Sequence, residues 1–226
     1  MNSISTMSAK KRSLTAVAIN AAIFVAQTLC VAAFWERGGE GNMLLFGFDM
    51  FRFFTVDSNV FCALASLCLI PLELKKAVKP QSRIPKWALL FKFMATVTVT
   101  LTLLVVVVFL GPISGNFFNM FTGGNLHMHL VGPLMAITSF CFFEDFEYLK
   151  KNTKLLPLIP VLTYGIVYAV MVLVIGPENG GWYDFYSFNM GGMWYVTFVV
   201  IGVVTAAISL LEFGLNQRRF KNVRKS

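Results

Sequence analysis

Six long apolar segments limit what this chain can fold into. Each is long enough to cross the roughly 30 Å of hydrocarbon in a bilayer, because a helix rises about 1.5 Å per residue. Inside lipid only a helix satisfies its own backbone groups within one segment. Few charges interrupt these segments, since the chain is 57% hydrophobic and only 13% charged. The sequence therefore predicts an all-α polytopic membrane protein, a single six-helix domain over residues 1–226, with helices near 14–34, 53–72, 86–110, 126–143, 155–175 and 193–213.

The first segment fits two descriptions. Lys10-Lys11-Arg12 precedes an apolar run, which is also the start of a cleavable signal peptide. The run over 14–34 is long enough to span a membrane and has no clear small-residue cleavage site. We interpret it as the first transmembrane helix.

The basic residues indicate the orientation. Of the 19 Lys and Arg residues, all but Arg37 and Arg52 fall before the first segment, around the link between the second and third, after the fourth, or after the sixth. This assignment counts Lys92 among the charges around the link between the second and third segments. The positive-inside rule then predicts cytoplasmic termini, and we expect the plasma membrane. The formal net charge of +8 lies in short runs, so it indicates topology rather than nucleic-acid binding.

A tripeptide recurs in the predicted outer loops. Phe48-Asp49-Met50, Phe118-Asn119-Met120 and Phe188-Asn189-Met190 are spaced by 70 residues, each shortly before an even-numbered helix. The spacing suggests three helical hairpins of similar plan arranged around one axis. Phe and Met are also common at membrane interfaces, which is the alternative explanation.

Polar residues cluster where the second segment begins. Thr55, Ser58 and Asn59 stand at i, i+3 and i+4, so a helix places them on one face, while Asp57 points elsewhere. Polar groups at this depth are costly and usually mark a functional site. A threonine hydroxyl becomes a nucleophile when a base lies within hydrogen-bond reach. Alone, Thr55 would more simply bond its hydroxyl to a backbone carbonyl.

Both histidines of the chain come at the start of the fourth segment. His127 and His129 are two residues apart, so on a helix they face roughly opposite ways. We favour His129 as a base because it lies deeper and because Pro133 removes the helical hydrogen bond to its carbonyl. Either histidine could instead be an interfacial residue without a chemical role.

Several supporting roles remain open. Asp57 could orient the histidine, pair with Arg52, or lie protonated in the bundle. Ser58, Asn59 and Asn125 are candidate donors to an oxyanion. A metal site could in principle combine His127 and His129 with Asp49, Asp57, Glu178 or Asp184. A helical His-x-His pair has poor geometry for one ion, so we expect no metal.

The two polar elements resemble a known family. Phe54-Thr55-Val56-Asp57-Ser58-Asn59, followed about 70 residues later by Asn125-Leu126-His127-Met128-His129 and then Pro133, resembles the androgen-induced and androgen-dependent transmembrane hydrolases and their bacterial relatives. In that family an intramembrane threonine and a histidine cleave esters of hydroxy fatty acids. The resemblance implies Thr55 as nucleophile and His129 as base. It covers the six-helix plan and these two elements, and Asp57 departs from the eukaryotic members.

The expected function is therefore hydrolysis of lipid esters near the outer leaflet, without a cofactor. We expect Thr55 and His129 to face each other across an apolar cavity between the second and fourth helices, with a fatty ester entering from the bilayer. Acyl transfer is the neighbouring alternative, with an alcohol replacing water. A transporter or channel using Asp57 as an ion or proton site, and a non-catalytic scaffold, are the alternatives from other classes.

Overall fold

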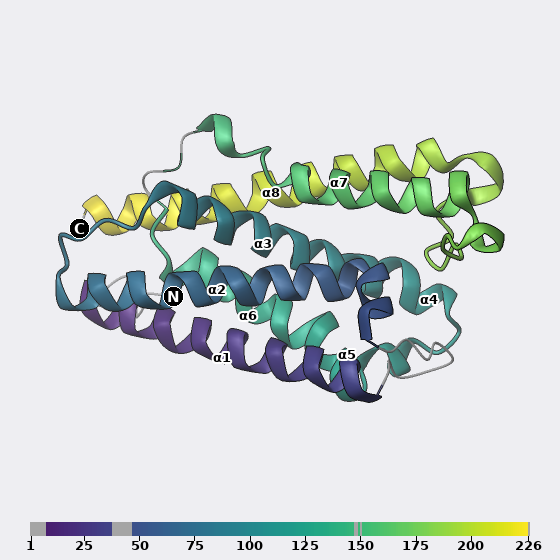
Figure 1. Cartoon of the computed structure of the whole chain (residues 1–226). Coiled ribbons are helices and arrows are strands. Elements are labelled where there is room, and N and C mark those ends of the chain that lie inside the picture. Colours follow the sequence, from purple (N-terminus) through teal and green to yellow (C-terminus); the bar gives the residue numbers. More distant parts are fainter. Residues whose placement is uncertain (1–7, 38–46, 147–148, 150, 226) are drawn as a thin grey trace.

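Long helices make up nearly all of the described molecule (Figure 1). The computed structural model describes residues 8–37, 47–146, 149 and 151–225, and no strand occurs among them. Six of its helical segments are long and apolar enough to cross a membrane. The predicted all-α membrane fold is confirmed.

The spans begin and end close to the predicted positions. The clearest differences are at two C-terminal ends, since α2 continues through Pro71 to Val78 and α8 continues to Lys225. The spans are α1 (Ala9–Arg37); α2 (Phe54–Val78); α3 (Lys86–Val105), a π-helix (Val106–Leu110) and α4 (Gly111–Ile113); α5 (Gly123–Leu126), a π-helix (His127–Val131), α6 (Gly132–Thr138) and a π-helix (Ser139–Phe143); α7 (Leu158–Ala169) with a π-helix (Val170–Ile175); and α8 (Trp194–Lys225).

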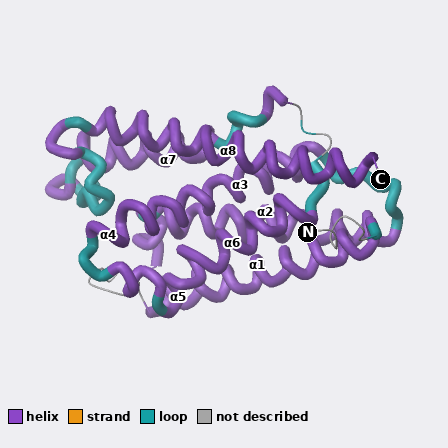
Figure 2. The backbone as a smooth tube through the Cα atoms, turned by 180° about the vertical axis from the view of Figure 1, so that it is seen from behind, coloured by secondary structure: helices purple, strands orange, loops and turns teal. Residues whose placement is uncertain are grey.

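The helices form a four-helix bundle with a hairpin on its flank. α1 and α2 pack against each other, and α3 and the fourth span complete the bundle. The α7–α8 hairpin packs mainly on α3 and on the π-helix Ser139–Phe143, and both views show it lying beyond α3 from α1 (Figures 1 and 2). The third span is accordingly the most buried of the six.

The threonines of α3 are satisfied locally. Thr96 donates its hydroxyl to the carbonyl of Lys92 at 2.9 Å, and Thr100 donates to the carbonyl of Thr96 at the same distance. Thr98 and Thr102 do the same with carbonyls three and four residues back. Such back-bonding lets a hydroxyl enter a low-dielectric interior without leaving a donor unpaired.

Glycine-proline pairs end the π-helical segments at three places. Proline has no N–H and its ring crowds the preceding turn, so the carbonyls ahead of it need another donor. In each pair the glycine N–H donates to the carbonyl five residues back, which widens the helix by one residue. The break that Pro133 predicts in the fourth span takes this form. The pairs are Gly111-Pro112, Gly132-Pro133 and Gly176-Pro177. Their glycine N–H groups donate to the carbonyls of Val106, His127 and Met171, respectively.

The three tripeptides are not equivalent. Residues 48–50 and 118–120 both lie in short 3₁₀-helices, Gly47–Arg52 and Phe117–Phe121, that precede α2 and α5. In both, the phenylalanine is exposed. In the third, Phe188 is buried and Met190 has a positive φ of 43°. The first two tripeptides therefore share a local conformation that the third lacks, and the predicted equivalence of all three is wrong.

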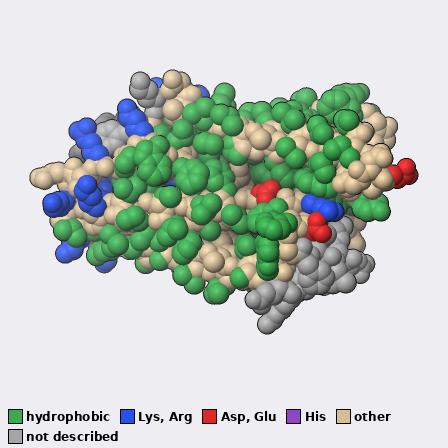
Figure 3. Space-filling view, viewed as in Figure 1, with side chains coloured by type: hydrophobic (Ala, Val, Ile, Leu, Met, Phe, Trp, Pro, Cys, Tyr) green, Lys and Arg blue, Asp and Glu red, His purple; other side chains and the backbone are tan. Residues whose placement is uncertain are grey.

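The two chain ends lie at the same end of the molecule (Figure 1). Lys and Arg side chains gather over this end, while acidic side chains appear toward the other (Figure 3). One assignment of a basic residue is wrong. Lys92 lies within α3 and is fully buried, so it is not a loop charge.

The orientation can be tested with single cysteines at the two ends. Ser114→Cys and Asn179→Cys replace exposed residues in the loops that follow the third and fifth spans. In intact cells both should react with a membrane-impermeant maleimide, because the basic residues favour the opposite end in the cytoplasm. Gln81→Cys, exposed in the α2–α3 loop, is the control that should stay unlabelled. The reverse pattern would overturn the orientation.

Candidate functional site

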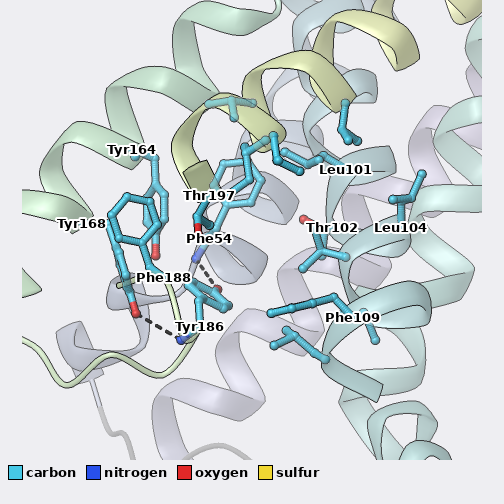
Figure 4. A pocket seen from close by; sticks show the side chains of 18 of the residues that line it. Phe54, Leu101, Thr102, Leu104, Phe109, Tyr164, Tyr168, Tyr186, Phe188 and Thr197 are labelled. Atoms are coloured by element: carbon cyan, nitrogen blue, oxygen red, sulfur yellow. Dashed lines mark hydrogen bonds between the residues drawn. The ribbon is translucent and has the colours of Figure 1, made fainter. Parts of the chain in front are cut away.

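An apolar cavity of about 440 Å³ lies between α3, α7 and α8. The first turn of α2 and the loop before α8 contribute Phe54, Thr55 and Tyr186 to its lining. Most of the remaining lining residues are aliphatic or aromatic (Figure 4). A volume of this size and polarity is typical of sites that bind small apolar ligands. We predicted a cavity between the second and fourth helices, whereas this one has no lining residue from the fourth span.

Tyrosines connect the cavity to the loop that covers it. Tyr164 of α7 donates its hydroxyl to the carbonyl of Arg52 at 2.6 Å, and Tyr168 donates to Asp184 Oδ1 at 3.1 Å. The hydroxyl oxygen of Tyr186 accepts the N–H of Phe54 at 3.1 Å. These contacts tie the start of α2 to α7 and to the loop (Figure 4).

Thr55 is the second residue of α2 and stands in the cavity wall. Its carbonyl accepts from Ser58 Oγ at 3.1 Å and from Asn59 Nδ2 at 2.7 Å. These bonds are made to the backbone of Thr55, and of the three side chains only that of Thr55 lines the cavity. Ser58 Oγ also lies 2.9 Å from the hydroxyl oxygen of Thr102 of α3, a residue that lines the cavity.

His129 is buried in the π-helix His127–Val131, with 8% of its surface exposed. Its Nδ1 lies 2.7 Å from the carbonyl oxygen of Met120. A carbonyl can only accept, so Nδ1 carries the proton, and in the neutral ring Nε2 holds the free lone pair. This is the tautomer that a general base needs.

Thr55 and His129 come from neighbouring elements but are not joined. Asn59 links those elements, because its Nδ2 donates both to the Thr55 carbonyl and to the carbonyl of Met128 at 3.1 Å. His129 does not line the cavity, and no hydrogen bond connects it to Thr55 among the residues described.

The remaining predicted residues have separate surroundings. Asn125 and Asp57 are half-buried, and Arg52 pairs with Asp49 at 2.6 Å instead of with Asp57. His127 is half-buried, and its Nε2, like Asn59 Oδ1, is a buried atom without a hydrogen-bond partner in the described part of the chain.

The carboxylates considered for a metal site are dispersed. Asp184 accepts the backbone N–H groups of Phe188 and Asn189 within its own loop, at 2.7 and 2.8 Å. No group of three or more His, Cys, Asp and Glu side chains gathers within residues 8–37, 47–146, 149 and 151–225.

Sequence reasoning missed a second polar cluster, deep in the opposite half of the bundle. Lys92 Nζ donates to Asn20 Oδ1 at 2.8 Å and to Ser66 Oγ at 2.9 Å. It lies 3.8 Å from Glu144 Oε1, which accepts from Asn20 at 2.7 Å and from Ser139 at 2.6 Å. All five side chains are fully buried. Lys92 could have indicated this cluster, because a lysine inside the apolar segment predicted over 86–110 needs buried polar partners.

The ion pair generates a stability prediction. Lys92→Met leaves the buried Glu144 carboxylate without its counter-charge, which should cost about 3 to 5 kcal/mol. Adding Glu144→Leu removes the orphaned charge and should recover much of that loss. Lys86→Met, at the exposed start of α3, should change stability by about 0.5 kcal/mol or less. Unfolding in detergent micelles measures all four proteins, and a double variant as unstable as Lys92→Met would contradict the ion-pair account.

Comparisons with family models, curated proteins and solved structures give no match to this chain.

Proposed function

We propose that this polytopic membrane protein hydrolyses lipid esters, with Thr55 as nucleophile and His129 as general base. One observation carries the proposal. Of the predicted site residues, Thr55 alone lines the apolar cavity, and it stands beside hydroxyl and amide groups at one end of it. A reactive hydroxyl at the end of an apolar space suits a substrate with a long hydrocarbon part and one polar bond.

The reaction has two steps. The Thr55 oxygen attacks the ester carbonyl while His129 Nε2 takes its proton, and the alcohol leaves with that proton. Water then attacks the acyl-threonine, which releases the fatty acid and restores Thr55. The proposal requires Thr55 and His129 to approach one another when substrate binds, as catalytic hydrogen bonds often tighten only in the complex. No cofactor takes part.

The apolar cavity can hold the hydrocarbon part of the substrate. The cavity runs beside α3 and α8 from Tyr186 and Phe188 toward Leu101 and Val204. Its walls are helices whose other faces carry exposed apolar side chains suited to lipid. We therefore place the acyl chain here, entering from the bilayer, with the carbonyl at Thr55.

Single and double variants test the mechanism. Thr55→Ala and His129→Ala should each lower ester hydrolysis by about 100-fold or more, because each removes one half of the activated nucleophile. The double variant should be little worse than either single one, since the pair acts as a unit. Hydrolysis of a fluorogenic long-chain ester by purified protein gives the rates.

Labelling by a fluorophosphonate probe checks the nucleophile directly. Wild-type protein should be labelled at Thr55, and Thr55→Ala should not be. His127→Ala is the matched control for His129→Ala and should cost much less, because His127 holds no bond to the loop before α5. Full activity in Thr55→Ala would remove the hydrolase proposal.

The placement of the acyl chain predicts a change in specificity. Val204 lines the cavity, whereas its neighbour Val203 is 63% exposed and does not. Val204→Trp should fill the end farthest from Thr55 and lower the rate for long-chain esters at least several-fold more than for short-chain esters. Val203→Trp adds the same bulk outside the cavity and should leave this ratio unchanged. Equal effects of the two variants would move the acyl chain elsewhere.

Transport is the second candidate, and the buried Lys92–Glu144 cluster is the observation that favours it. Ionisable groups within a membrane often mark ion or proton pathways. With the Thr55 region, this cluster gives the bundle polar groups in both halves. Its members bond one another and do not line the cavity, which favours the hydrolase. Proton or cation flux into proteoliposomes that Glu144→Gln abolishes would favour transport.

A further inference from the structure

The hydroxyl of Tyr186 occupies an unusual position beside Thr55. Its oxygen lies 3.1 Å from the N–H of Phe54, the first residue of α2, and Phe54, Thr55 and Tyr186 all line the cavity. Figure 4 shows Tyr186 next to Phe54 at the cavity wall. Its hydroxyl also has hydrogen-bonding neighbours in the side chains of Thr55 and Tyr164.

Several contacts hold Tyr186 in this place. Its backbone N–H donates to the hydroxyl oxygen of Tyr168 at 3.1 Å, and Tyr168 in turn donates to Asp184. Its ring packs against Phe185 and Tyr168, with centroids 4.7 and 5.3 Å away. A donor fixed before the reaction stabilises developing charge without reorganisation, which is the main requirement for an oxyanion site.

Tyr186 also keeps a proton to donate. Burial raises the pKa of Tyr186 to about 12, although the Phe54 N–H and the hydrogen-bonding contacts with Tyr164 and Thr55 act in the opposite direction. The hydroxyl is therefore neutral at physiological pH. Its oxygen accepts the Phe54 N–H, so its own proton is available to a neighbouring acceptor, and the Thr55 side chain lies within that reach.

The other tyrosine hydroxyls of the cavity already donate their protons to protein groups. Tyr164 donates its proton to the Arg52 carbonyl, and Tyr168 donates to a carboxylate oxygen of Asp184. The oxyanion donors suggested by the sequence are also placed elsewhere. Ser58 contacts Thr102, Asn59 donates to two carbonyls, and neither they nor Asn125 line the cavity.

We propose that Tyr186 is a further catalytic residue, whose hydroxyl donates a hydrogen bond to the carbonyl oxygen of the ester that Thr55 attacks. This proposal rests on the proposed function. As Thr55 bonds to the carbonyl carbon, the carbonyl oxygen gains negative charge, and the Tyr186 hydrogen bond strengthens. The phenolic proton stays on Tyr186 throughout, and the bond weakens again when the alcohol leaves and the carbonyl re-forms.

Removing the hydroxyl alone tests the role. Tyr186→Phe should lower kcat for a long-chain ester by about 100-fold or more, the usual loss for one oxyanion donor. KM should change by about threefold or less, because the bond is strong only in the transition state. Tyr183→Phe removes a hydroxyl from the same loop, at a side chain that is 76% exposed and does not line the cavity. It is the matched control and should keep most of kcat.

Three measurements give an unambiguous outcome. Thr55-dependent hydrolysis in the wild-type protein is read first, and its absence would overturn the proposed function and this inference together. If that activity is present, a Tyr186→Phe kcat within about fivefold of wild type would overturn the role of Tyr186 alone. Equal losses in Tyr186→Phe and Tyr183→Phe, or a Tyr186→Phe loss matched by a fall in the unfolding temperature, would assign the effect to the structure of the loop and also overturn it.

Discussion

The buried pair of Lys92 and Glu144 is the interaction on which the bundle depends most. An ammonium and a carboxylate cannot enter a low-dielectric interior unless they meet each other and enough further hydrogen bonds. Those bonds come from Asn20 of α1, Ser66 of α2 and Ser139 of the fourth span. Asn216 of α8 adds a bond to the Glu144 carbonyl at 2.8 Å. Because the charges must be satisfied together, this cluster fixes how the first, second, third, fourth and sixth spans meet.

The opposite half of the molecule is assembled by different means. There the glycine-proline pairs follow widened turns in the third, fourth and fifth spans. The helix continues through the pair in the third and fourth spans, whereas the fifth ends at Gly176, which has a φ of 72°. A Cβ on Gly132 would collide with the side-chain amide of Gln27, so a larger residue here would force the Gln27 side chain of α1 to move. The widened turn also carries His127 and His129, which sets their positions relative to α2.

The cavity lies where the third hairpin leaves the bundle. α7 and α8 contact α3 and the π-helix Ser139–Phe143. Tyr164 of α7 bonds to Arg52, just before α2, and Tyr186 of the loop after α7 bonds to Phe54 of α2. The space between these contacts is apolar because aliphatic side chains of α3 and α8 line it. Thr55 is brought to this space by the first turn of α2, so a residue of the bundle meets a cavity built largely by the flanking hairpin.

The sequence by itself determined the membrane fold, because spans of about 20 apolar residues have no other stable form in a bilayer. It also located Thr55 and His129 near one end of the molecule, since polar residues in apolar segments are few. It could not place Lys92, Glu144 or Tyr186. Lys92 meets Asn20 across 72 residues of chain, and Tyr186 meets Phe54 across 132. Local periodicity reports which face of a helix is apolar, but not which distant side chain packs against it. Only the tertiary structure decided that Thr55 faces the α7–α8 hairpin, because helix packing and the satisfaction of buried charges select the neighbours.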